Sequence, residues 1–145
     1  MLMQGSFAIP CGRDKVYTFV SEPASVIKCV PGLQDYTLDE DKMVSATVKV
    51  SFGFIRSIFQ ATSKVSREDP VAHSATLELN GSGAGGGFSG SVELSITGDD
   101  TSSELGWTAN VTVNGPLGSL GKPLLEGYIK KMVEQMLSCV KTKLS

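Results

Sequence analysis

The sequence lacks any apolar run approaching the roughly 18 residues that a membrane-spanning helix requires. Its N-terminus carries no basic segment followed by an apolar one, so no secretory signal is expected. Neither sign of charge dominates, because 13 Lys and Arg face 15 Asp and Glu, for a formal net charge of −2. Such a balance provides no overall field that would attract nucleic acid. These absences predict a soluble, cytoplasmic chain that binds no nucleic acid.

Metal-ligating residues are also scarce. The chain has one His and three widely separated cysteines, Cys11, Cys29 and Cys139, with no Cys-x-x-Cys pair or Cys/His cluster. A closed zinc site needs about four such ligands at short spacings. We therefore expect no metal and no cofactor, and in a cytoplasmic chain we expect all three thiols to be reduced and structural.

The first third of the chain predicts one strand followed by two short helices. Alternation of apolar and polar residues over 2–9 is typical of a half-buried strand, which Pro10 ends. The spacing becomes helical from Gly12, and a second short helix restarts at Pro23 and ends at the Pro31–Gly32 pair.

The middle of the chain predicts six more strands. Each alternates apolar and polar residues between turn-forming residues, over about 36–38, 44–52, 58–66, 71–79, 88–96 and 105–113. The glycine-rich stretch 80–87 lacks the Lys-Ser/Thr of a phosphate-binding loop and is expected to be a flexible hairpin loop. Seven strands with one apolar face each predict an antiparallel sheet that is solvated on one side.

From about Leu120 the pattern is helical to the end of the chain. The apolar stripe is wider than a coiled-coil seam and comprises Leu125, Tyr128, Ile129, Met132, Val133, Met136, Leu137, Val140 and Leu144. Only the inner face of the sheet is large enough to cover it. The 145 residues (1–145) therefore predict a single α+β domain of helix-grip form. In it, a seven-stranded curved antiparallel sheet closes over a long C-terminal helix, with two short helices after the first strand.

The inward positions of the predicted sheet lack the groups that catalysis needs. Asp and Glu fall in turns or on the outward face, and His73 is the one imidazole. General acid–base or nucleophilic chemistry requires a titratable group held beside its partner. We therefore expect ligand binding without catalysis. For His73 two interpretations remain: a structural histidine that donates one hydrogen bond, or a polar anchor in an apolar pocket.

Small inward residues on the strands face flexible methionines on the helix, which predicts incomplete filling and a pocket for an apolar ligand. The turn at Phe54 and Ile55 keeps two large apolar side chains where polar residues are usual, and predicts either a gate over the pocket or core packing. The expected ligand-binding residues are Phe54, Ile55, Phe59, His73, Phe88, Leu94, Trp107, Ala109, Ile129, Met132 and Met136.

Several segments resemble one protein family. They are Phe7–Pro10, Val16–Val20, Cys29–Gly32, Gly83–Phe88 and Val113–Gly121. Cys-Val-Pro-Gly at that distance from the first helix, followed late by Gly-x-Leu-x-x-Leu-Gly, is similar to CoxG, the G subunit of carbon monoxide dehydrogenase. The similarity extends over nearly the whole chain.

The resemblance implies a fold of the START-like, polyketide cyclase/lipid-transport (SRPBCC) superfamily. It also implies a non-catalytic accessory role toward a molybdenum-containing carbon monoxide dehydrogenase, peripheral contact with the inner face of the cytoplasmic membrane, and a quinone-like or lipid-like ligand. Family members often carry a C-terminal extension, whereas this sequence stops at Ser145, so ligand carriage is the stronger expectation. The alternative is an enzyme of the same fold, a cyclase or hydrolase of aromatic or lipid-like substrates with His73 as base.

Overall fold

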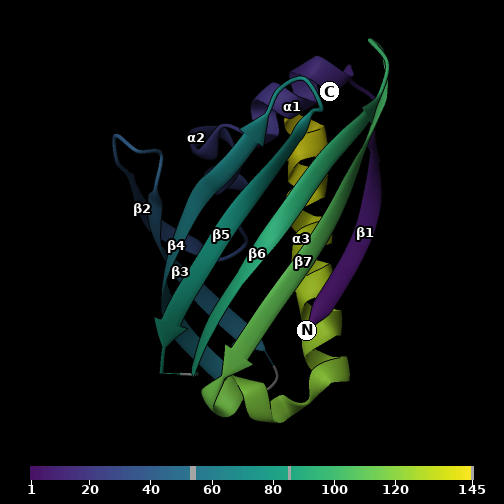
Figure 1. Ribbon diagram of the computed structural model, residues 1–145. Coiled ribbons are helices and arrows are strands. Elements are labelled where there is room, and N and C mark those ends of the chain that lie inside the picture. The colour runs from purple at the N-terminus through teal and green to yellow at the C-terminus, as the bar shows by residue number, and fades with distance from the viewer. Residues whose placement is uncertain (53–54, 85, 145) are drawn as a thin grey trace.

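A curved sheet wraps around one long helix in the computed structural model, which describes residues 1–52, 55–84 and 86–144 (Figure 1). The elements in chain order are β1 (Leu2–Ile9), α1 (Arg13–Val20), α2 (Pro23–Val26), the 3-10 segment η1 (Ile27–Cys29), β2 (Leu33–Leu38), β3 (Val44–Phe52), β4 (Ile55–Asp69), β5 (Ser74–Gly83), β6 (Gly86–Gly98), β7 (Ser103–Asn114), the 3-10 segment η2 (Gly115–Leu120) and α3 (Lys122–Leu144).

The seven strands form one antiparallel sheet in the order β1-β7-β6-β5-β4-β3-β2. The strands β1 and β2 are neighbours in sequence but lie at opposite edges, so α1, α2 and η1 cross from one edge to the other. These helices lie at the end of the sheet where the chain terminates, and η2 lies at the other end (Figure 1). The predicted α+β helix-grip architecture is confirmed. No helix within the described ranges combines the length and apolar character needed to cross a bilayer.

The register of the strands defines the floor beneath α3. Residues opposite one another in antiparallel strands point to the same face, so each row across the sheet is a row of neighbouring side chains. Two central rows are rich in small residues: Val44, Ser63, Leu79, Gly90 and Val111 form one, and Ala46, Ala61, Gly81, Phe88 and Val113 form the next.

Buried apolar residues gather in three clusters instead of one continuous core. The largest joins β1, α1, β6, β7 and the C-terminal half of α3; the second lies under η1 and β3; the third contains Phe59, Leu117 and Leu125. In the middle of the floor, Ala61, Leu77 and Leu79 are half-buried and belong to none of these clusters. The centre of the floor is thus less tightly covered than its two ends.

The start of β5 differs from the prediction. The alternation continues back to Val71, but the strand begins at Ser74, and 71–73 form a turn in which Val71 is 91% exposed. The Asp69 carboxylate accepts a hydrogen bond from the Ala72 N–H (3.1 Å), which closes a turn typical of Asp. His73 has a left-handed backbone (φ 55°), which is incompatible with a strand.

The glycine-rich stretch also differs from the predicted flexible loop. β5 extends to Gly83, β6 begins at Gly86, and these two residues pair. Gly81 allows this because the Phe88 ring lies across it, and a Cβ at Gly81 would stand 2.4 Å from that ring. The described residues on both sides of this turn are therefore part of the close-packed sheet.

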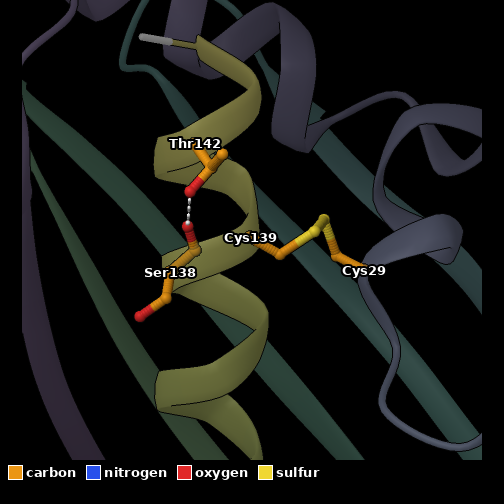
Figure 2. The surroundings of a disulfide bond; sticks show 4 residues. All are labelled: Cys29, Ser138, Cys139 and Thr142. Atoms are coloured by element: carbon orange, nitrogen blue, oxygen red, sulfur yellow. Dashed lines mark hydrogen bonds between the residues drawn. A yellow bond between two sulfur atoms is a disulfide. The ribbon is translucent and has the colours of Figure 1, made fainter.

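A disulfide between Cys29 and Cys139 corrects the expectation of three reduced thiols. Figure 2 shows it joining η1 to α3. The two residues are 110 positions apart in sequence, but the fold brings their Cα atoms to 5.6 Å, within the range that a disulfide spans. Cys11 is a free, buried thiol.

Candidate functional site

The long helix α3 presents two different faces. Leu125, Leu137 and Val140 are buried in the core, and Ile129 and Val133 pack beside them. A second stripe, at spacings of three and four residues, lines an open groove: Leu124, Gly127, Tyr128, Lys131, Met132 and Gln135. The predicted single wide stripe therefore divides into a core face and a groove face.

The groove lies between α3, β3 and the turn after η1. Pro31 and Gly32 line it from that turn, Lys49 and Ser51 from β3, and the second stripe together with Pro123 from α3. Its volume is about 790 Å³, and it is open to solvent. Sites for small molecules fall in the range of about 300–1,000 Å³.

Two glycines shape the groove in different ways. Gly32 has φ 80°, and a Cβ there would lie 2.2 Å from the Lys49 carbonyl oxygen, so the turn can approach β3 only with glycine. Gly127 lies in the helix, and a Cβ there would meet no atom within 4 Å. Glycine lowers helix stability by about 1 kcal/mol relative to alanine, and packing gives no reason for it at this position. Gly127 widens the groove.

The groove combines apolar and cationic groups. Leu124 is 59% exposed at its rim, and Met132 is half-buried within it. The charged residues of the described lining are Lys49 and Lys131. Burial raises the pKa of Tyr128, so its phenol is held neutral.

The structure distributes the described site residues that were predicted among four places. Met132 lines the groove. Met136 is half-buried on α3 and, like Met132, belongs to none of the three clusters. His73 lies in the turn before β5. The other described side chains pack in the core: Phe59 and Phe88 stack at 6.2 Å in the third cluster, and Leu94, Trp107, Ala109 and Ile129 belong to the largest.

Two further predicted residues, Phe54 and Ile55, were expected in an apolar turn. Phe54 lies outside the described residues, and for Ile55 the structure describes the backbone alone, as the first residue of β4.

His73 is placed away from the groove, beside α1. Its Nε2 lies 2.5 Å from the Asp14 carboxylate, and its ring meets Tyr17 edge-on at 5.5 Å. Tyr17 donates a hydrogen bond to the Ser74 carbonyl (3.0 Å). The hydrogen bond from His73 lowers the pKa of Asp14. These contacts fasten the β4–β5 turn to α1.

Most residues that line the groove were not predicted from the sequence, among them Pro31, Gly32, Lys49, Gly127 and Lys131. The signal that could have revealed them was Gly127, a helix-weakening residue in the middle of a long helical pattern. Within the described ranges, no three His, Cys, Asp or Glu side chains gather in a way that could hold a metal ion.

Comparison with known proteins gives a family match and a set of similar folds. The family model of CoxG, the G subunit of carbon monoxide dehydrogenase, matches residues 5–145. A conserved protein from Geobacillus kaustophilus has a similar structure, with a TM-score of 0.91 and 19% identity over 99% of this chain and 95% of that chain. No curated protein sequence matches the chain.

Two more solved structures have a similar fold. A START superfamily protein from Mycobacterium smegmatis has a TM-score of 0.69 and 13% identity, covering 99% of this chain and 96% of that one. The Zhui aromatase/cyclase from a Streptomyces species has a TM-score of 0.73 and 11% identity, covering 99% and 93%. The expected START-like fold is confirmed.

Proposed function

Because the chain belongs to the CoxG family, we propose that it is a non-catalytic accessory protein that binds an apolar small molecule between its sheet and α3. The observation that carries this proposal is the groove face of α3, where Gly127 leaves open space beside Met132. The ligand enters along this face and reaches the half-buried floor around Ala61 and Leu79.

Burial of apolar surface supplies the affinity. Each Å² that a guest removes from water contributes about 25 cal/mol, less the free energy lost in immobilising it. Met132 and Met136 adapt to guests of different shape because the thioether chain is flexible and polarisable. On the sheet, the small residue Ala61 is half-buried and belongs to none of the three clusters, so it leaves room for such a guest.

The residues of the groove support a binding role better than a catalytic one. The titratable groups of its described lining are two lysines and a tyrosine, without a carboxylate or imidazole to pair with them. The enzyme alternative depended on His73 as a base, yet its Nε2 is engaged by Asp14 at the α1 end of the sheet. Aromatase/cyclase chemistry in a protein of similar fold belongs to that protein.

The family supports two finer proposals. The ligand is quinone-like or lipid-like, and the partner is a molybdenum-containing carbon monoxide dehydrogenase that the chain accompanies at the inner face of the cytoplasmic membrane. Affinity capture of the tagged chain from its native host tests the partner. Carbon monoxide oxidation and molybdenum should co-elute with it in a fixed ratio, and elution of the chain without either would contradict the association.

Filling the groove tests ligand binding directly. Gly127→Leu places an apolar side chain in open space, so the protein should fold with at least its original stability while binding of decylubiquinone or dodecan-1-ol falls about tenfold or more. Binding is measured by isothermal titration calorimetry. The matched control is Lys130→Leu, which adds the same side chain at an exposed position of α3 outside the groove. Unchanged binding in Gly127→Leu would overturn the proposal.

A further inference from the structure

We infer, on the basis of the proposed function, that the ligand is a single-chain amphiphile with an anionic head group, held between Lys131 and Lys49 at the groove mouth. The inference selects the lipid-like class over the neutral quinone-like class. The apolar tail of the ligand follows Met132 toward the floor of the sheet, and its head remains at the rim in contact with water.

The charge of the groove has one sign. Lys49 on β3 and Lys131 on α3 both line the groove, and the described lining contains no Asp or Glu. Neither lysine forms an ion pair with a described carboxylate; the neighbouring pair on α3 joins Lys122 to Glu126 (3.8 Å). A chain with a net charge of −2 therefore presents a local cationic mouth.

The start of α3 adds to this positive potential. Pro123 and Leu124 belong to its first turn and line the same groove, and that turn contains no acidic residue. The partial positive charge at the N-terminus of the helix is therefore not offset by a carboxylate within that turn. This partial charge would favour an anion at the groove mouth, although the proposed site does not depend on it.

Apolar groups in the groove would contact the alkyl chain of such an amphiphile. Leu124, at 59% exposure, would be covered by an apolar chain lying along the rim. Gly127 leaves that path open between Leu124 and Lys131, one helical turn away in each direction. A small inorganic anion would use the lysines alone and leave this apolar surface uncovered. An alkyl chain with a carboxylate or phosphate head uses both.

Binding of matched ligands tests the head group. Dodecanoate and dodecyl phosphate should bind wild-type protein about tenfold or more tightly than dodecan-1-ol, measured by calorimetry at low salt. Lys131→Gln, and separately Lys49→Gln, should reduce this preference several-fold without changing the affinity for dodecan-1-ol. Lys130→Gln removes the same charge from the adjacent exposed position and should keep the preference. Raising the salt concentration should weaken the preference in wild type, because the mouth is solvated.

The outcomes separate the two proposals. Equal binding of the acid, the phosphate ester and the alcohol would overturn the anionic head and leave the apolar ligand site standing. Loss of the preference in Lys130→Gln to the same extent as in Lys131→Gln would also overturn it, since the effect would then come from overall charge. Failure of all three ligands to bind would overturn the proposed function as well. A preference for dodecyl phosphate alone would assign a phosphate head.

Discussion

At the scale of single residues, the two glycines that line the groove have different roles. Gly32 occupies a left-handed conformation against the backbone of Lys49, where a side chain clashes, whereas Gly127 has an ordinary helical environment open to the groove. Gly32 therefore supports the fold, and Gly127 keeps space for a ligand.

Alanine substitution should distinguish these roles. Gly127→Ala should raise the free energy of unfolding by about 0.5–1 kcal/mol because alanine loses less conformational entropy in a helix. Gly32→Ala should lower it by more than that, because the new Cβ is strained at φ 80° and meets the Lys49 carbonyl. Urea-induced unfolding measures both. Destabilisation by Gly127→Ala would show that this position is packed.

The contact between His73 and Asp14 should make stability depend on acid pH. The His73 hydrogen bond lowers the pKa of Asp14 below its ordinary value of 3.8, so the folded state favours the ionised carboxylate. The resulting stability is present above pH 3.8 and is lost as the pH falls through the lower folded pKa. Asp14→Asn should therefore lower the melting temperature at pH 7, and the difference from wild type should shrink toward about pH 2. A difference that stays constant over this range would contradict the pairing.

His73 also illustrates a limit of sequence-based prediction at the residue scale. Its apolar neighbours fit a strand alternation, but the Asp69 side chain closes a turn that the alternation does not register. The partner Asp14 lies 59 residues earlier, so no local pattern could show the pair. Met132 was predictable because helical spacing alone placed it among the apolar residues of α3.

At the scale of elements, the long helix was predicted almost to the residue, but its two faces were not separated. The sequence shows one broad stripe that includes both Leu137, which is buried in the core, and Met132, which lines the groove. Hydrophobicity alone does not distinguish a side chain covered by protein from one that a ligand would cover. The interruption at Gly127 and the cation at Lys131 mark the second face.

The disulfide is an element-scale feature that should contribute strongly to stability. It connects η1 to α3 across 110 residues, and cross-links of this span stabilise by about 2–5 kcal/mol. The double substitution Cys29→Ser with Cys139→Ser should lower the free energy of unfolding by that amount, measured in urea. Dithiothreitol reduces the disulfide to two thiols and is itself oxidised to a cyclic disulfide. It should lower the stability of the wild type by a similar amount and leave the stability of the double variant unchanged.

Thiol counting provides an independent check. In urea without reductant, the unfolded wild type should expose one thiol, from Cys11, and after reduction it should expose three. Three thiols before reduction would contradict the cross-link. Widely separated cysteines cannot reveal this pairing in the sequence, because only the folded topology places η1 beside the C-terminal half of α3.

At the scale of the whole molecule, strand periodicity and turn residues predicted the order of the helices and strands. From this order the fold could be predicted. Seven alternating segments and one amphipathic helix permit few arrangements that bury every apolar face. The residues that line the groove were harder to predict. Inward residues such as Trp107 and Phe59 were expected to line a pocket, but they pack in the core clusters, since a side chain's direction does not determine what covers it.

Ligand binding should connect the three core clusters and stabilise the whole domain. An apolar chain seated between α3 and the floor would cover Leu77 and Leu79, which belong to none of the clusters. At a free concentration of about 100 times its Kd, dodecanoate should raise the free energy of unfolding by about 2.7 kcal/mol. For a domain of this size, this corresponds to a rise in melting temperature of roughly 5–10 °C. The Gly127→Leu variant should show little of this rise.

Hydrogen exchange then locates the stabilised region. Amides in the centres of β4 and β5, around Ala61 and Leu79, should gain protection on binding because the least-covered part of the sheet becomes ordered against the ligand. Leu105, already buried in the largest cluster, should change mainly through global stability. If protection increased only at the rim, near Leu124 and Lys49, the ligand would be bound at the surface. The groove would then be a shallow docking site without access to the interior, and Gly127→Leu would be expected to leave the floor amides unaltered.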